Sequence, residues 1–263
     1  MRATYTANRP TPLMERDFYN GLLLAWAALA VPTFVSLFFI SAPYGRHFRR
    51  GWGPTLPTRW AWFWMEIVAV LGLPLFFLLG NRRDPVSWLW LVLWEIHYLH
   101  RTFVYPFRRR PGAGRNSLAI VLMAMLFNIV NAYLNGRWLF TFGPIRDLAW
   151  LTRPPVLVGL ALFAFGLALN LDSDNRLLAA RRESSGYTVV QGGAFRWVSS
   201  PNYLGEILEW VGFALATASP AATVFALWTV ANLAPRAWAN HRWNQEHLPG
   251  YPAERRALIP GLW

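Results

Sequence analysis

The chain contains no cysteine and no lysine, so all 25 of its basic residues are arginines. The lack of cysteine excludes disulfides, thiolate nucleophiles and cysteine-ligated metals. The lack of lysine excludes a Schiff base with a carbonyl substrate and the lysine of a Walker-type phosphate loop.

Charged residues are also scarce: they make up 14% of the chain, whereas a soluble domain has about 25%. Hydrophobic residues make up 55%, and there are 16 tryptophans. This composition is typical of an integral membrane protein, in which aromatic side chains gather at the membrane boundary. The net charge of +12 could also indicate nucleic-acid binding. Because the arginines lie between apolar runs, as loop charges do, we expect a lipid bilayer and no nucleic acid as partner.

Seven apolar runs are candidates to cross a bilayer, which takes roughly 20 apolar residues. They cover residues 18–40, 60–79, 86–103, 117–134, 155–171, 203–217 and 221–233. The last two are short, so we expect them to be tilted or to lie partly at the interface, with a tight turn at Ser219-Pro220 between them. Because no linker or repeat interrupts the chain, we expect one all-α domain over residues 1–263.

The arginines also predict the topology. If the N-terminus lies outside, about two thirds of them fall in cytoplasmic loops, as the positive-inside rule requires, and the C-terminus is cytoplasmic. The absence of lysine suggests a GC-rich bacterial genome, so we expect a bacterial inner membrane. The first apolar run begins near Phe18 and has no small-residue cleavage site, so we expect no cleaved signal peptide.

Two ionisable side chains inside apolar runs are candidate catalytic residues. Glu66 lies in WFWMEIVAVLG, and an ionisable group within a span usually marks a site, although a structural hydrogen bond is the alternative. Tyr98 lies in WEIHYLHRTFVY. A buried phenol can donate a hydrogen bond to a ketone and stabilise a developing enolate, but an interfacial tyrosine is the commoner case. The histidines lack the spacing of a metal site, so we expect no metal.

Three further stretches each place polar side chains on one helix face near the cytoplasm. These groups are Asn170, Asp174 and Arg181; Asn202, Glu206 and Glu209; and Arg236, Asn240 and Asn244. Solvated helix ends are one interpretation. The other is a shared partner: amide and carboxylate groups bind hydroxyls and amides, and arginine binds phosphate. A dinucleotide has all of these groups, although no GxGxxG fingerprint predicts a Rossmann domain. Glu209 has no predicted role beyond a structural hydrogen bond.

Four motifs resemble those of the steroid 5α-reductases: HYLHRTFVYPF, NLDSDNRLL, QGGAFRWVSSPNYLGEILEWVGFALAT and the final YPAERRALIPGLW. The resemblance extends from Trp94 to the C-terminus and is weaker around Glu66. It implies a seven-helix membrane fold, NADPH as hydride donor and 3-oxo-Δ4 steroids as substrates. In that family a glutamate and a tyrosine at the positions of Glu66 and Tyr98 hydrogen-bond the ketone oxygen.

The resemblance also implies a set of cofactor contacts. They are Asn170, Asp174, Arg181, Tyr187, Asn202, Glu206 and Arg236, with Asn240 and Asn244 standing where the family often has histidine and tyrosine. Met65 stands where mammalian members have glutamine. We therefore expect a monomeric reductase that transfers hydride from NADPH to C5 of the enone and a proton to C4.

Other functions remain open at this point. A methyltransferase of the isoprenylcysteine or phospholipid type would use S-adenosylmethionine and would not need the Glu66–Tyr98 pair. A reductase could also act on another enone lipid. A non-catalytic sterol or lipid binder or transporter would have polar residues along a path across the membrane, whereas here they gather in the cytoplasmic half.

Overall fold

The computed structural model describes residues 13–41, 43–49, 51–110, 112, 114–184 and 186–263. Within them, seven α-helices form the molecule, which confirms the all-α prediction. The helices are α1 (Leu13–Phe39), α2 (Thr58–Leu79), α3 (Pro85–Leu99), α4 (Leu118–Arg137), α5 (Pro154–Glu183), α6 (Pro201–Thr217) and α7 (Pro220–His247). Two short antiparallel strands, β1 (Thr55–Pro57) and β2 (Arg115–Ser117), join the segments before α2 and α4.

Two helices are much longer than the apolar runs that predicted them. α5 continues to Glu183 and α7 to His247, because hydropathy marks only the apolar part of a helix and both go on as polar helices. The prediction that the last helix is short is therefore wrong, whereas α6 is short, with 17 residues. Four helical segments of the described residues, Leu13–Phe39, Thr58–Leu79, Leu118–Phe142 and Pro154–Glu183, are long and apolar enough to cross a membrane. Seven crossings and their orientation remain predictions.

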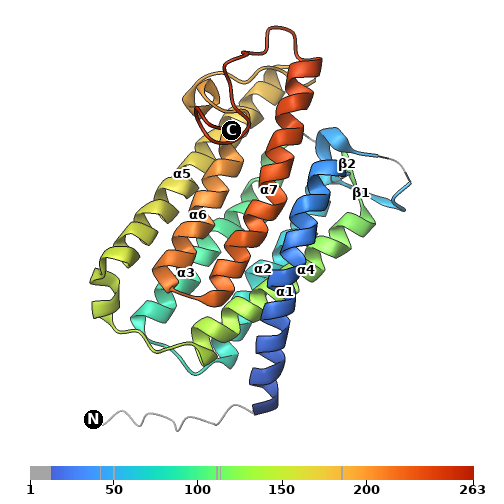
Figure 1. Cartoon of the computed structure of the whole chain (residues 1–263). Coiled ribbons are helices and arrows are strands. Elements are labelled where there is room, and N and C mark those ends of the chain that lie inside the picture. Colours follow the sequence, from blue (N-terminus) through green and yellow to red (C-terminus); the bar gives the residue numbers. More distant parts are fainter. Residues whose placement is uncertain (1–12, 42, 50, 111, 113, 185) are drawn as a thin grey trace.

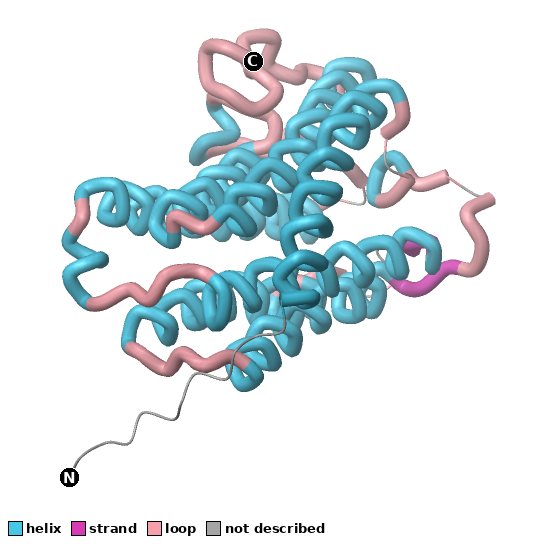
Figure 2. The backbone as a smooth tube through the Cα atoms, turned by 60° about the horizontal axis from the view of Figure 1, so that its bottom comes forward, coloured by secondary structure: helices cyan, strands magenta, loops and turns pink. Residues whose placement is uncertain are grey.

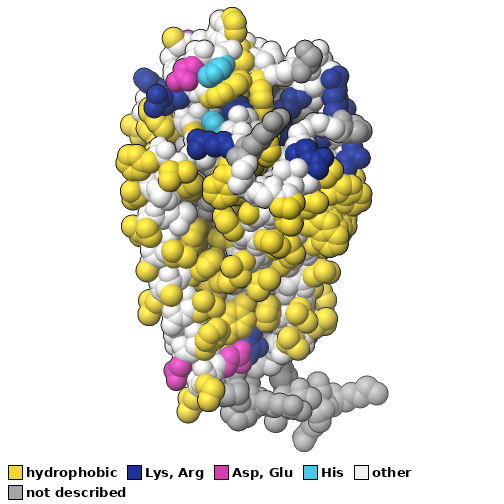
Figure 3. All heavy atoms as spheres, turned by 90° about the vertical axis from the view of Figure 1, so that its right-hand side faces the viewer, with side chains coloured by type: hydrophobic (Ala, Val, Ile, Leu, Met, Phe, Trp, Pro, Cys, Tyr) yellow, Lys and Arg dark blue, Asp and Glu magenta, His cyan; other side chains and the backbone are white. Residues whose placement is uncertain are grey.

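The arrangement of the helices matches that of a membrane protein. In Figure 1 the helices lie side by side, and α1 begins at the end opposite the C-terminal segment. Loops gather at the helix ends (Figure 2). On the face shown in Figure 3, hydrophobic side chains cover the middle and most arginines lie near one end. An apolar belt with a basic end is the surface pattern that a bilayer selects.

A π-helical turn, residues His100–Val104, continues α3 without a break. Such turns are rare and occur often at functional sites. Here the turn carries Arg101, whose side chain is directed into the protein and is only 6% exposed. The start of α3 is fixed by Asp84, whose side chain accepts a hydrogen bond of 2.9 Å from the backbone N–H of Ser87.

The core between the helices is rich in aromatic side chains. Trp94 and Trp210 are fully buried, with ring centroids 5.4 Å apart. The indole N–H of Trp94 donates to the carbonyl of Ala69 at 3.1 Å, which ties α3 to α2. A buried indole needs such an acceptor because its donor would otherwise lose its hydrogen bond to water.

Helices α5 and α6 touch through glycines. A Cβ atom on Gly205 would lie 2.5 Å from the backbone nitrogen of Asn170, and a Cβ atom on Gly166 would lie 2.5 Å from the carbonyl oxygen of Gly205. Small residues allow membrane helices to approach so closely that their backbones meet. The contact brings the polar side chains of α5 and α6, which lie one turn away, within hydrogen-bonding distance of each other.

Gly205→Ala should lower stability, because the new methyl group would collide with the backbone of α5. We expect a loss of about 1–3 kcal/mol, the usual cost of overpacking, measured as a lower midpoint of thermal unfolding in detergent. Gly21→Ala is the matched control, since a Cβ atom at Gly21 of α1 would have no heavy atom within 4 Å. Equal midpoints for the two variants would contradict the role of this contact.

Candidate active site

The predicted pair Glu66 and Tyr98 lies in the interior, on α2 and α3. Tyr98 is 4% exposed and lies against Trp94 and Trp210, at ring-centroid distances of 4.7 and 5.7 Å. The carboxylate of Glu66 is close enough to act electrostatically on the Tyr98 hydroxyl. The side-chain N–H of Asn128 donates to Glu66 at 3.4 Å. The structure thus places the two residues together among aromatic side chains, and their catalytic role remains a prediction.

Next to Tyr98, His97 and Glu209 form a buried pair that links α3 to α6. The Nδ1 atom of His97 lies 3.0 Å from both carboxylate oxygens of Glu209, and Glu209 is fully buried. The His97 ring also packs edge-on against Tyr98 at 5.0 Å. The structural hydrogen bond predicted for Glu209 is present, and it fixes the residue that precedes Tyr98.

Arg101 is the centre of a second buried cluster. Its guanidinium group donates to Asp174 and to Glu206, both at 2.6 Å. Asn202 donates to the other oxygen of Asp174 at 3.1 Å, and Asn170 donates to the Asn202 carbonyl at 2.9 Å and to Glu206 at 3.4 Å. Four predicted cofactor residues therefore meet around one cation.

Arg101 was missing from the predicted site. It stands in the HYLHRTFVYPF motif, four residues after His97. This spacing places Arg101 on the same helix face as His97 but does not by itself indicate a role. A signal was available, because an arginine that closely follows an apolar helix can neutralise the carboxylates of neighbouring helices. Two carboxylates around one guanidinium leave a net negative charge, which favours hydroxyl and amide donors over phosphate as ligands.

The polar face of α7 is covered by residues 44–47, which follow α1. The guanidinium group of Arg236 stacks on the ring of Tyr44 at 3.5 Å and donates to the Tyr203 hydroxyl at 3.0 Å. Burial raises the pKa of the Tyr44 phenol, and the charge of Arg236 opposes this rise. The predicted spacing of Arg236, Asn240 and Asn244 is confirmed as one face of a continuous helix.

The other two residues of this face contact the same segment. The Nε2 atom of His47 lies 3.1 Å from the side-chain oxygen of Asn240, and Arg46 donates to the side-chain oxygen of Asn244. Burial, together with the charge of Arg236, lowers the pKa of His47. The imidazole is therefore neutral near pH 7 and donates an N–H to Asn240. Burial also lowers the pKa of Arg46.

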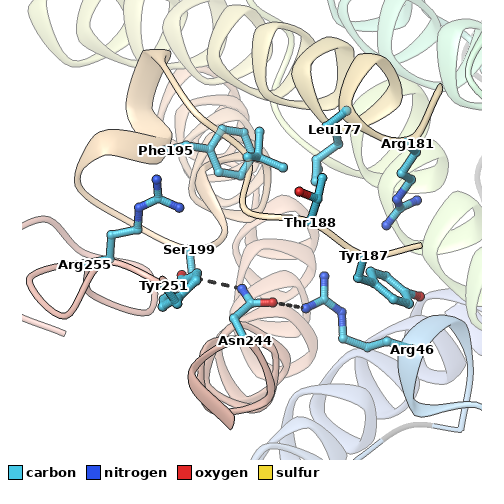
Figure 4. Close-up of a pocket in the computed structure, with 12 residues that line it drawn as sticks. Arg46, Leu177, Arg181, Tyr187, Thr188, Phe195, Ser199, Asn244, Tyr251 and Arg255 are labelled. Atoms are coloured by element: carbon cyan, nitrogen blue, oxygen red, sulfur yellow. Dashed lines mark hydrogen bonds between the residues drawn. The ribbon is translucent and has the colours of Figure 1, made fainter. Parts of the chain in front are cut away.

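An arginine-lined cleft lies beside this face (Figure 4). Arg46, Arg181 and Arg255 bring three guanidinium groups to it, and Tyr187 and Tyr251 contribute aromatic rings. The remaining lining residues are Leu177, Ala180, Thr188, Val190, Phe195, Ser199 and Asn244. Of the predicted cofactor residues, Arg181, Tyr187 and Asn244 thus lie in the cleft.

The C-terminal segment forms one wall of the cleft. The backbone N–H of Ser199 donates to the Arg256 carbonyl at 2.8 Å, and the N–H of Arg256 donates to the Trp197 carbonyl at 2.9 Å. This pairing positions Tyr251, whose hydroxyl lies 2.5 Å from Oγ of Ser199, and Arg255. Neither residue was predicted to contact the cofactor, because an irregular segment has no periodicity from which its neighbours can be inferred.

Comparison with known proteins places the chain in a family. The family profile described as 3-oxo-5-alpha-steroid 4-dehydrogenase matches residues 115–263. Steroid 5-alpha-reductase DET2 of Arabidopsis thaliana is 38% identical over 260 residues, which cover 95% of this chain and 99% of the relative. The same-named protein of Solanum lycopersicum is 36% identical over 254 residues, covering 95% and 98%.

A mammalian relative agrees with the plant proteins. The 3-oxo-5-alpha-steroid 4-dehydrogenase 1 of Rattus norvegicus is 36% identical over 260 residues, covering 95% of this chain and 98% of its own length. Identity at this level extends over nearly the whole of both sequences. The chain therefore belongs to the steroid 5-alpha-reductase family, the 3-oxo-5-alpha-steroid 4-dehydrogenases.

Proposed function

We propose that this protein reduces the Δ4 double bond of 3-oxo-Δ4 steroids with NADPH, giving 5α-reduced 3-oxo steroids. Hydride goes to C5 and a proton to C4. The observation that carries the proposal is the proximity of the half-buried Glu66 to the buried Tyr98 in a chain of this family. The relatives named as steroid reductases support the substrate class.

The chemistry of the cleft fits a dinucleotide. Its three arginines suit phosphate groups, including the additional phosphate of NADPH, because guanidinium binds phosphate through paired N–H donors. Arg255 supports this assignment, since its buried Nε has no hydrogen-bond partner among the residues that the structure describes. Tyr187 and Tyr251 offer ring faces for stacking.

The other predicted contacts suit the uncharged parts of the same molecule. Asp174 and Glu206 keep acceptor capacity for ribose hydroxyls beside Arg101, and Asn170 and Asn202 present amide groups. Arg236, Asn240 and Asn244 would add guanidinium and amide groups from α7. When bound, NADPH supplies the hydride.

The chemical step depends on Tyr98 and Glu66. The Tyr98 hydroxyl donates a hydrogen bond to the ketone oxygen, which draws electron density from C5 through the conjugated system. Glu66 either donates to the same oxygen in its protonated form or orients the Tyr98 phenol. The resulting enolate oxygen is stabilised by these donors until C4 takes up a proton. The aromatic walls exclude water and strengthen each hydrogen bond.

We propose that the protein works as a monomer in a bilayer, with its cofactor cleft facing the cytoplasm. The basic end seen in Figure 3 supports this orientation. A bacterial inner membrane is part of the proposal and rests on the lysine-free composition, while the relatives named above come from plants and a mammal.

Purified protein in detergent should oxidise NADPH when testosterone or progesterone is added. The readouts are the loss of nicotinamide absorbance and a product two mass units heavier than the substrate. NADPH, but not S-adenosylmethionine, should raise the midpoint of thermal unfolding, which separates the reductase from a methyltransferase. Absence of turnover with every 3-oxo-Δ4 steroid tested would favour another enone lipid.

Tyr98→Phe and Glu66→Gln should each lower kcat by roughly 10²–10³-fold, the usual effect of losing one oxyanion donor. KM should change little, because the hydrogen bond to oxygen strengthens mainly as negative charge develops. Tyr133→Phe is the matched control: Tyr133 packs against Phe76 and Tyr19, away from the pair. Full activity in either site variant would contradict the assignment.

Arg181→Gln should weaken NADPH binding by roughly 10–100-fold, the range expected for a lost hydrogen bond to a charged group. It should affect NADH less if Arg181 contacts the additional phosphate. Arg176→Gln is the control on the same helix, because Arg176 lies outside the cleft and pairs with Asp172 at 2.8 Å. Binding can be measured by protection against thermal unfolding, and equal affinities for the two variants would remove Arg181 from the site.

A further inference from the structure

Three asparagines lie on one face of α4, a helix that is otherwise apolar. Asn128, Asn131 and Asn135 are all buried. A buried amide is costly in such surroundings unless its N–H and C=O groups find partners. Their hydrogen bonds therefore indicate what each amide is for.

Asn135 fixes the orientation of Asn131. The Nδ2 atom of Asn135 lies 3.0 Å from the backbone oxygen of Asn131 and 2.8 Å from its side-chain oxygen. A backbone oxygen only accepts, so the atom of Asn135 that contacts it must be its NH₂ group. This NH₂ group only donates, so the atom of Asn131 that faces it must be the oxygen. The NH₂ group of Asn131 consequently points away from Asn135.

The other end of the Asn131 amide is directed to the proposed reaction centre. Its side chain lies beside the Tyr98 hydroxyl and interacts with it without a hydrogen bond of normal geometry. Asn131 is 2% exposed, and its Nδ2 atom has no hydrogen-bond partner among the described residues. An unpaired buried donor costs free energy, so an acceptor brought by a ligand would remove this cost.

Asn128 serves the same centre in another way. Its NH₂ group donates to the backbone carbonyl of Met65 at 2.7 Å and to the carboxylate of Glu66 at 3.4 Å. It therefore holds the carboxylate from α4, and it is a positioning residue whose donors are used within the protein. Asn131 differs because its NH₂ group remains available.

We propose that the Asn131 amide donates a second hydrogen bond to the ketone oxygen of the substrate, beside the Tyr98 hydroxyl. The inference rests on the proposed function and adds a catalytic residue to it. A ketone oxygen has two lone pairs and accepts two donors, so Glu66 takes its orienting role when Tyr98 and Asn131 both donate. When hydride adds to C5, the C4–C5 π electrons move toward the oxygen, and the enolate charge is shared between Tyr98 and Asn131 until C4 is protonated.

The test combines turnover with the binding of two unreactive ligands. One is a saturated 3-oxo steroid and the other is its 3-deoxy analogue, and both affinities are measured by protection against thermal unfolding in the presence of NADP⁺. Asn131→Leu should lower kcat by roughly 10–100-fold. It should lower the affinity for the 3-oxo ligand about 10-fold and leave the affinity for the 3-deoxy ligand unchanged. Asn131→Asp keeps the shape of the side chain and removes the donor when ionised. It should also lose the preference for the 3-oxo ligand over the 3-deoxy ligand, and it provides the test if the leucine variant fails to fold.

Asn232→Leu is the matched control, because this amide of another helix donates to the Trp228 carbonyl at 3.0 Å and should not affect the preference for the ketone. The loss of preference for the 3-oxo ligand that Asn131→Leu causes should persist when Tyr98→Phe is also present. A loss that disappears there would show that Asn131 acts only through Tyr98. An equal loss of affinity for both ligands in Asn131→Leu, or wild-type affinities and turnover in that variant, would also overturn the assignment.

The wild-type protein separates the failure of this inference from that of the proposed function. If the wild type reduces 3-oxo-Δ4 steroids and prefers the 3-oxo ligand while the Asn131 variants match it, only the role of Asn131 is wrong. If the wild type does neither, the proposed function is wrong, and the assignment of Asn131 fails with it.

Discussion

The polar interior depends on one buried cation, the guanidinium group of Arg101. Its two partners, Asp174 and Glu206, come from different helices, and each would be costly to bury alone. Removing one member of a buried ion pair typically costs about 3–5 kcal/mol, because the other charge stays behind without compensation. The cation thus permits carboxylates from α5 and α6 to lie together next to a π-helical turn. The glycine contact between these helices makes the short distances possible.

The same arrangement divides the polar residues by charge. Around Arg101 the carboxylates are in excess, whereas the cleft lined by Arg46, Arg181 and Arg255 is strongly positive. A ligand that spans the two regions must be anionic at one end and rich in hydroxyl or amide groups at the other. A dinucleotide meets this requirement. Tyr98 lies instead among aromatic side chains, against Trp94 and Trp210.

Much of this could be predicted from spacing and hydropathy. Apolar runs located all seven helices, and four-residue spacing placed Asn170 with Asp174 and Arg236 with Asn240 on common faces. The ends of α5 and α7 could not be predicted in this way, since hydropathy reports where a helix is apolar and not where its hydrogen bonding stops.

The parts of the site that sequence reasoning missed have a common physical cause. Tyr251 and Arg255 lie in an irregular segment and Arg46 in a single 3₁₀ turn, where spacing along the chain says nothing about neighbours in space. Asn131 lies in a regular helix, but its importance depends on the direction of an amide that only Asn135 reveals. The family motifs contained some of these residues, whereas their roles follow from the tertiary contacts.

The cleft has a consequence for the biogenesis of the protein. Its walls come from Arg46, just after the first helix, and from Arg255, after the last one. During synthesis the early helices enter the membrane long before the final wall has left the ribosome. The cleft can therefore form only after α7 and the segment that follows it have been synthesised, so a ligand bound there cannot guide the insertion of the helices that precede them.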